Sequence, residues 1–355
     1  MITVLSLIFV FVMLVLAHEL GHFLAAKSVG IRVERFYIGF NLFGLGIKKK
    51  IGHTEYGLGL IPLGGYVKVA GIVDESMDTQ LSGAEWEFQS KNALQKIWFM
   101  SAGVLANMLL AVVIFTFLTL ANGISEADTV TVAGSVSAGF PAEEAGIQPG
   151  DEIRAIDGIE VSTWEELTTL IHDRPDEELE VTWIHQGDLR QAIIKTRATE
   201  MLIDDEIKLI GLIGIGPKVN IRPAGFGEAW ISGCTATWRW FVLTYKSLGM
   251  IITGKAGLRD IGGPIFIAQL AGQSAQSGFS ALLGLLAIIS VNLAFINVLP
   301  IPALDGGHIA IVLVETVRRK PLSLRARLAV QQFGVMVLLA LIAVIFYNDI
   351  MRLFN

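Results

Sequence analysis

His18, Glu19 and His22 carry the strongest chemical signal in the sequence. They stand in "HELGH", after an apolar run in which residues 1–17 contain no charged side chain. Four residues separate the two histidines, so on a helix both imidazoles project from one face. This is the H-E-x-x-H pattern, in which two neutral histidines bind Zn²⁺ and the glutamate acts as general base. The pattern does arise by chance, but ionisable groups at membrane depth are costly and usually functional.

A catalytic zinc site needs a third protein ligand, with water in the fourth position. Asp305 and His308, in "NVLPIPALDGGH" (297–308), are the candidates. A carboxylate offsets the charge of the dication in a low-dielectric site, which favours Asp305 and leaves His308 as an alternative ligand or a neighbouring group. Without a metal, the histidines would be hydrogen-bonded packing groups and Asp305 a helix cap. Three other histidines in polar segments are expected to lie at the surface: His53, His172 and His185.

The elements that position these residues are long apolar segments. The chain has 355 residues, 53% of them hydrophobic, which is too apolar for an ordinary soluble enzyme. Four segments reach the length of a membrane span: 2–24, 97–121, 282–304 and 331–351. Segment 229–253 is also apolar, but Arg239 and Lys246 lie among tryptophans and a tyrosine, which favours a helix in the membrane interface. Cys234 is the only cysteine, so no intrachain disulfide can form.

The distribution of charge predicts the orientation. Residues 25–96 carry nine Lys and Arg, and a short basic loop precedes the last span, whereas residues 122–280 carry 12 Lys and Arg against 22 Asp and Glu. The positive-inside rule then places 25–96 and 315–330 in the cytoplasm, and 122–280 and both termini outside. The net charge of −6 argues against nucleic acid as a partner.

Depth in the membrane predicts that the two motifs meet. His18 and His22 come 17–21 residues into the first span, about 25–30 Å along its axis. Asp305 comes about 23 residues into the third span, which is entered from the same side, and Pro300 and Pro302 would shorten that path. We therefore expect one site near the cytoplasmic side. If 229–253 crossed the membrane, Asp305 would emerge at the opposite face and the site would fail.

Residues 36–71 alternate and are rich in glycine, as in short strands joined by turns. They predict either a small cytoplasmic β-hairpin or a re-entrant sheet packed against the helices, which membrane depth allows only beside protein or water. Segment 57–71, with Gly64, Gly65 and Tyr66, offers an edge to which an unwound substrate could add as a strand. Asn107 and Asn297 could hydrogen-bond substrate backbone or, alternatively, join helices, and the second role is favoured for Asn107.

Residues 124–200 read as a compact domain inserted between the spans. Four segments have strand character, and Ser162 with Glu165 forms a capping box at the start of "STWEELTTLIHD". The turn "AGIQPGDEI" (145–153) resembles that of PDZ domains, which bind extended peptides at a sheet edge. Because the turn occurs once, we predict one PDZ-like domain rather than a generic β-rich one.

The predicted fold class is a polytopic α-helical membrane protein with about four transmembrane helices, a membrane-associated β-hairpin region and an inserted α+β PDZ-like domain. The expected parts are a membrane half (1–121, with the β-loop at 36–71), the PDZ-like domain (124–200), a connector with an interfacial amphipathic helix (201–281), and a second membrane half with the "LDGG" segment (282–355).

The chain resembles the site-2 protease family of intramembrane zinc metalloproteases, in particular the bacterial branch that regulates the sigma-E stress response. The likeness lies in "HELGH" (18–22), "IPLGGYVKVAG" (61–71), "SAGVLAN" (101–107), "GGPIFIA" (262–268) and "NVLPIPALDGGH", and it covers nearly the whole chain. It implies zinc held by His18, His22 and Asp305, with Glu19 activating water. It also implies substrate contacts by the β-loop at 57–71 and by Asn297. Asn107 and Pro300 are further candidate substrate-binding residues.

The resemblance further implies regulated proteolysis in a bacterial inner membrane. The expected substrates are single-pass membrane proteins, such as an anti-sigma factor already shortened by another protease, or remnant signal peptides, and the PDZ region would exclude uncut substrates. Two departures are a single PDZ domain where the best-known members carry two, and Val104 where many members have proline. The alternatives are a non-catalytic scaffold that binds peptides through its PDZ-like domain, or a metal transporter, for which we see no paired repeats.

Overall fold

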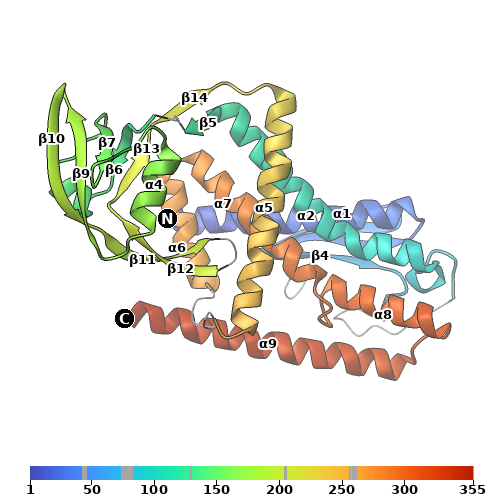
Figure 1. The fold of residues 1–355 in the computed structure, drawn as a ribbon. Coiled ribbons are helices and arrows are strands. Elements are labelled where there is room, and N and C mark those ends of the chain that lie inside the picture. Colours follow the sequence, from blue (N-terminus) through green and yellow to red (C-terminus); the bar gives the residue numbers. More distant parts are fainter. Residues whose placement is uncertain are drawn as a thin grey trace. The chain divides into compact units, whose positions relative to one another are not determined.

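A computed structural model of the protein describes residues 1–41, 46–72, 83–127, 130–203, 206–255, 257 and 262–354. Residues 42–45 of the predicted β-region therefore lie outside the described residues. The chain forms two compact units. A helical unit comprises residues 1–119 and 225–355, and an inserted unit comprises residues 120–224 (Figure 1).

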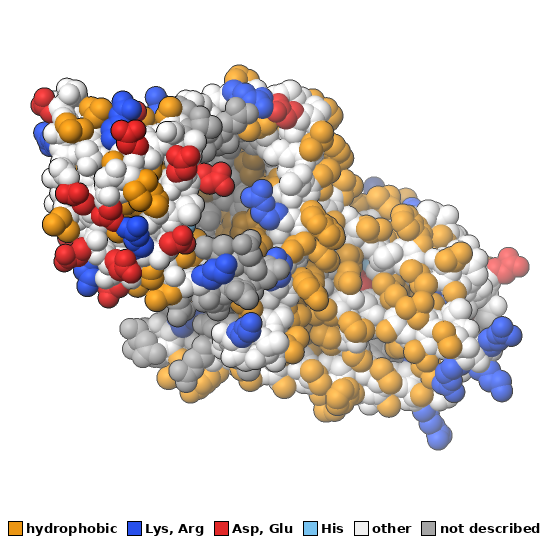
Figure 2. All heavy atoms as spheres, in the orientation of Figure 1, with side chains coloured by type: hydrophobic (Ala, Val, Ile, Leu, Met, Phe, Trp, Pro, Cys, Tyr) orange, Lys and Arg blue, Asp and Glu red, His pale blue; other side chains and the backbone are white. Residues whose placement is uncertain are grey.

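Among the described residues, four helices of the helical unit are long and apolar enough to span a membrane, which confirms the predicted number. They are α1 (Ile2–Ser28), α2 (Ala93–Asn122), α7 (Phe279–Val298) and α9 (Leu324–Phe354). The 27 residues of α1 extend about 40 Å, more than the hydrocarbon thickness of a bilayer. Apolar side chains cover much of the visible surface of this unit, whereas charged side chains of both signs cover the inserted unit (Figure 2). The first surface suits lipid and the second suits water.

The core of the helical unit forms where α1, α2 and α7 meet. Val10 and Leu14 of α1, Ala111 of α2 and Val291 of α7 are all nearly inaccessible. Small residues let α1 and α2 approach closely, because a Cβ added at Gly21 would come within 2.3 Å of the Ala102 carbonyl oxygen. This close crossing brings the middle of α2 against the end of α1 that carries the histidines.

The third predicted span ends earlier than expected. Helix α7 stops at Val298, and α8 (Asp305–Arg318) begins after an irregular segment that contains Pro300 and Pro302. Proline breaks the helix because it lacks an N–H donor and clashes with the preceding turn. Gly306 is required here, since an added Cβ would lie 2.2 Å from the Val298 carbonyl oxygen. The glycine lets α8 fold back on the end of α7, which positions Asp305.

Four strands between residues 33 and 69 form a mixed sheet rather than a single hairpin. Its strands are β1 (Val33–Phe40), β2 (Gly46–Ile51), β3 (Thr54–Gly59) and β4 (Ile61–Val69), in the order β2-β3-β1-β4. Strand β1 lies between β3, to which it is parallel, and β4, to which it is antiparallel. Two strands that follow β1 later in the sequence therefore pair with its two sides. A Cβ added at Gly65 would lie 2.9 Å from Val15 of α1. The sheet therefore packs against a helix, as expected for the predicted sheet that packs against the membrane helices.

Two further α-helices, α5 and α6, belong to the described part of the helical unit. Helix α5 (Phe226–Ile252), predicted to lie in the interface, is not among the four candidate spans, and it runs crosswise to α1 and α9 (Figure 1). Its exposed Trp238 and Tyr245 are typical of a membrane interface. At α6 (Pro264–Ser277), the carboxylate of Asp349 on α9 accepts hydrogen bonds from the backbone nitrogens of Gly263 and Ile265, both 2.9 Å. These bonds satisfy donors at the start of α6.

The inserted unit is a small α+β domain. Strand β9 (Glu178–His185) pairs with β10 (Asp188–Lys195) and β7 (Glu152–Ile156), and β8 (Ile159–Glu160) completes this sheet in the order β10-β9-β7-β8. Its other elements are β5 (Ile124–Ala127), β6 (Ala133–Val136), α3 (Pro141–Glu144), α4 (Trp164–His172), β11 (Arg197–Ile203), β12 (Glu206–Leu212), β13 (Ile215–Pro217) and β14 (Val219–Arg222). Ile153, Leu167, Val181 and Trp183 form its core. Strands β13 and β14, assigned to the connector by sequence, pair with β6 and β5.

The structure confirms the predicted fold class and corrects two details of this unit. The capping box of α4 consists of Thr163 and Glu166, one residue later than predicted, because the Thr163 side chain accepts from the Glu166 nitrogen. His185 is not a surface histidine: only 8% of it is exposed, and its Nδ1 lies 2.8 Å from Oδ1 of Asp151. Its strand, β9, is central in the sheet, so alternate side chains point into the core.

Candidate metal centre

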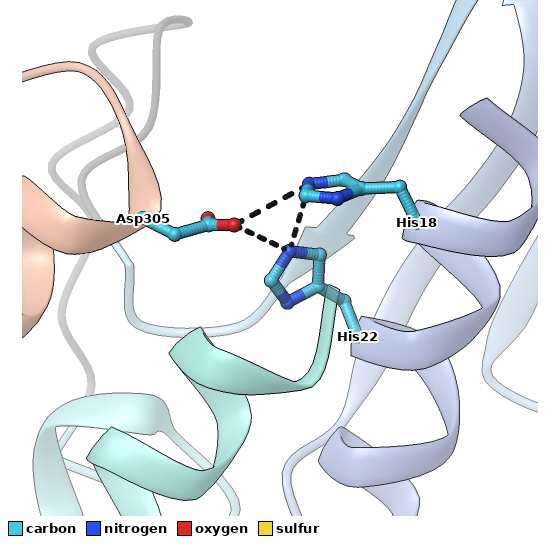
Figure 3. A group of neighbouring side chains, drawn as sticks. All are labelled: His18, His22 and Asp305. Carbon is cyan, nitrogen blue, oxygen red and sulfur yellow. Dashed lines mark hydrogen bonds and ion pairs between the residues drawn. The ribbon is translucent and has the colours of Figure 1, made fainter. Parts of the chain in front are cut away.

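His18 and His22 lie one turn apart on α1 and point to the same side (Figure 3). Their Nε2 atoms are 3.2 Å apart, and His22 is 7% exposed. Two imidazole nitrogens at this distance need a proton or a cation between them, because two facing lone pairs repel. Local helix geometry therefore sets up the first half of a metal site.

Asp305 reaches the same point from α8. Its Oδ2 atom lies 3.4 Å from Nε2 of His18 and 3.3 Å from Nε2 of His22 (Figure 3). It is the first residue of α8, so the break after α7 determines where its side chain points. The two motifs, more than 280 residues apart in sequence, thus converge as the depth argument predicts.

The three donor atoms fit a divalent cation. Bonds of about 2.0–2.2 Å place neighbouring ligands of a tetrahedral zinc ion about 3.3–3.6 Å apart. The three observed separations, 3.2, 3.3 and 3.4 Å, lie around the short end of this range. Asp305 Oδ2 is buried and makes no hydrogen bond within the described part of the chain. A buried carboxylate oxygen without such a partner is costly, and a bound cation would satisfy it. Two imidazoles and one carboxylate are also a common zinc ligand set.

Helix α2 supports the histidines from behind. The Nδ1 atom of His22 lies 2.9 Å from the carbonyl oxygen of Phe99. Gly103 makes the close approach possible, because an added Cβ would lie 2.4 Å from Nε2 of His22 and 2.6 Å from Cε1 of His18. Sequence reasoning did not identify Phe99 or Gly103. The four-residue spacing of Gly103 and Asn107 within an apolar helix was the available signal.

A cavity of about 590 Å³ opens at the three ligands. Glu19, His308 and Met100 line it on the helical side, and Gly65 and Tyr66 of β4 line it on the sheet side. Glu19 thus faces the same space as the ligands. His308 lies one turn after Asp305 on α8, but the cluster of ligand atoms within 4.8 Å of one another contains Asp305 and not His308.

The predicted substrate-contacting residues separate into two groups. Gly65 and Tyr66 line the cavity, and Gly64 precedes them in β4 with φ of 130°. Neither Asn297 nor Pro300 is among the residues that line the cavity. Asn297 lies in the last turn of α7 and is 8% exposed, and Pro300 is exposed. Asn107 is fully buried, with its side chain against His18. Its position therefore does not support a direct contact with substrate.

Two basic residues of the cavity were not predicted. Arg35 of β1 and Lys68 of β4 pair side by side in the sheet, and both line the cavity. The Nε atom of Arg35 also lies 4.0 Å from Oε1 of Glu55. The Tyr37 hydroxyl, a hydrogen-bond donor to Glu55, lowers the pKa of that carboxyl, with smaller contributions from nearby basic groups. Only the pairing of β1 with β4 brings these residues beside the metal site, and no local pattern indicates that pairing.

Comparison with known proteins agrees with this geometry. Residues 6–341 match the model of peptidase family M50. A protein of Agrobacterium fabrum is 34% identical to this chain, and the match covers 98% of this chain and 95% of that protein. One of Clostridium perfringens is 35% identical and covers 95% of both chains. Both bear the name "putative zinc metalloprotease".

Among solved structures, the chain is similar to the PDZ domain of an SdrC-like protein from Listeria innocua. The match has 26% identity, covers 27% of this chain and 100% of that chain, and has a TM-score of 0.22. The family match, in contrast, extends over both motifs of the metal centre. The chain therefore belongs to peptidase family M50 and is a zinc metalloprotease.

Proposed function

We propose that this protein cleaves transmembrane segments of single-pass membrane proteins within the bilayer. The observation that carries the proposal is the position of the metal ligands: His18 and His22 lie in a helix long and apolar enough to span a membrane. Peptide bonds that reach this cavity would be those of membrane-embedded or juxtamembrane segments. A soluble protease has no need to build its site into such a helix.

His18, His22 and Asp305 would hold the zinc, and Glu19 would act as general base. When bound, zinc lowers the pKa of water to about 7 and polarises the scissile carbonyl. The Glu19 carboxylate takes the proton of the attacking water and delivers it to the nitrogen of the leaving amine. Its place on α1 next to His18, facing the same cavity, supports this role.

Strand β4 would present the substrate. A peptide bond inside a helix is shielded, so the substrate must be unwound and held extended near the metal. Within the described residues, β4 forms one edge of its sheet and pairs only with β1. An unwound substrate could add to this edge through backbone hydrogen bonds, with Gly65 and Tyr66 beside the ligands.

The distribution of basic residues supports the proposed orientation in a bacterial inner membrane. The inserted unit would lie outside, and the metal centre near the cytoplasmic side. The narrower likeness to the bacterial regulator of sigma-E protease, in a single-PDZ form, suggests anti-sigma factors as substrates, with remnant signal peptides as a second class. Proteolysis would then release a cytoplasmic fragment and start a stress response.

The inserted unit supplies the features for the alternative function, a non-catalytic scaffold that binds peptides. A groove of about 220 Å³ lies between α4 and β13, lined by apolar residues that include Trp164, Leu167, Ile213 and Ile215. Within the described residues, β13 pairs on one side only, with β6. In the proposed protease, the same groove would select substrates that another enzyme has already shortened.

Glu19→Gln distinguishes the protease from the scaffold. We expect cleavage of a model transmembrane substrate by the purified variant to fall by a factor of about 10²–10⁴, because the general base is lost. Bound zinc should stay at one ion per chain, measured by atomic emission, because the three ligands are intact. In cells, uncut substrates should accumulate. Unchanged cleavage would reject the mechanism, and absence of cleavage by the wild type on all membrane substrates would favour the scaffold.

A further inference from the structure

Asn107 occupies an unusual position for an amide side chain. It lies in the apolar helix α2, none of its surface is exposed, and its amide group contacts His18 across 3.3 Å between Nδ2 and Nδ1. Its Oδ1 atom is buried and has no hydrogen-bond partner within the described residues. An unsatisfied buried carbonyl costs about 1–3 kcal/mol, so this arrangement calls for an explanation.

The chemistry of His18 resolves the mismatch. His18 directs Nε2 toward His22 and Asp305, so it would bind zinc as a neutral imidazole through that atom. Its Nδ1 must then carry the proton and needs an acceptor. Rotating the Asn107 amide by 180° exchanges its oxygen and nitrogen without changing the outline of the side chain. After this rotation, Oδ1 accepts the hydrogen bond from Nδ1, so the amide oxygen and the protonated imidazole nitrogen satisfy each other.

The second histidine has an equivalent partner on the same helix. A backbone carbonyl can only accept, so the contact with Phe99 makes Nδ1 of His22 a donor and leaves Nε2 free for metal. Phe99, Gly103 and Asn107 are spaced by four residues and form one stripe of α2. We propose that Asn107 is a positioning residue, which fixes the tautomer and orientation of His18 and thereby sets the affinity for zinc.

The inference rests on the zinc site and extends the proposed function from the ligands to their support. The same residue also joins helices, but through a different atom. The Ser290 hydroxyl of α7 donates to the backbone oxygen of Asn107 across 2.8 Å. Helix pairing and ligand positioning are therefore separable, and Ser290→Ala is a matched control for the side-chain variants. Both residues are fully buried.

The test compares Asn107→Leu, Asn107→Asp and Ser290→Ala in the purified full-length protein. Zinc affinity is measured by competition with a chelator, and the site geometry by the visible spectrum of the cobalt-substituted protein. Loss of an outer hydrogen-bond partner typically lowers metal affinity 10–100-fold, so we expect that loss, with an altered cobalt spectrum, for Asn107→Leu. Asn107→Asp keeps an acceptor oxygen, so its affinity should stay close to that of the wild type. Ser290→Ala should keep the wild-type affinity and spectrum.

Three outcomes would overturn the inference. Wild-type affinity and spectrum in Asn107→Leu would show that the amide does not support His18. An equal loss of zinc affinity in Asn107→Asp and Asn107→Leu would show that the Asn107 amide donates a hydrogen bond to His18 rather than accepting one. An equal loss in Ser290→Ala would assign the effect to helix packing. Failure of the proposed function is recognised separately, since the wild type would then bind zinc and cleave no membrane substrate.

Discussion

The inserted unit and the helical unit each hold an aspartate with a buried oxygen beside histidine, and the two aspartates differ in the partners of that oxygen. In the inserted unit, Asp151 Oδ1 contacts Nδ1 of His185 at 2.8 Å, and Oδ2 accepts from the Gln148 nitrogen at 2.8 Å. Both oxygens have partners. In the helical unit, Asp305 Oδ2 lies 3.3 Å or more from its two histidines and makes no hydrogen bond with the described residues.

The difference separates a structural pair from a ligand site. A closed pair stabilises the fold because each buried polar atom is satisfied, and it leaves no donor free for an ion. The donor atoms of His18, His22 and Asp305 are spaced as zinc ligands, and Oδ2 of Asp305 has no hydrogen-bond partner among the described residues. Buried His and Asp in proximity therefore do not identify a metal site; the spacing of the atoms and their missing partners do.

Asp305→Ala should have the largest effect in this comparison. Loss of a hydrogen-bond partner of a metal ligand lowers metal affinity by up to about 100-fold. Loss of the ligand itself should therefore lower zinc affinity by more than about 100-fold and abolish cleavage. Zinc content of the purified variant checks this expectation, and hydrogen exchange in residues 120–224 should stay unchanged. Full zinc occupancy would point to His308 or another group as the third ligand.

Asp151→Ala should have the opposite pattern. It leaves His185 and the Gln148 nitrogen without their partner in a buried site, and we expect a loss of about 3 kcal/mol in the stability of the inserted unit. Hydrogen exchange in β7 and β9 measures it, while zinc content should remain that of the wild type. Arg154→Ala, which removes an exposed ion pair with Glu152, is the control and should cost no more than about 1 kcal/mol.

A loss of zinc in Asp151→Ala would contradict the division into a structural pair and a ligand site. So would unchanged hydrogen exchange in the inserted unit, because a satisfied buried pair has to contribute to its stability.

The smallest expected effect is on the stability of α4, whose capping side chain, Thr163, is bonded within its own helix. Thr163→Ala removes the side-chain cap of α4 and should cost about 1 kcal/mol, seen as faster hydrogen exchange in the first turn of that helix. Ser162→Ala is the neighbouring control, with an effect near zero. The reverse order would place the cap at Ser162, as sequence alone predicted.

Short-range patterns were sufficient to predict much of the molecule. Hydropathy identified the four long helices, and helical spacing placed His18 and His22 on one face. The prolines before Asp305 indicated an interruption of the helix, although the predicted span ran to residue 304 and α7 ends at Val298. These features follow from the sequence because each depends on the conformational preferences of a few adjacent residues.

Only the tertiary structure decided which distant groups meet. The pairing of β1 with both β3 and β4 built the four-stranded sheet and brought Arg35 and Lys68 to the cavity. The crossing of α1 and α2 placed Phe99, Gly103 and Asn107 behind the histidines. The physical reason is that partner choice depends on how whole surfaces pack, and small residues such as Gly21 permit an approach that no local periodicity encodes.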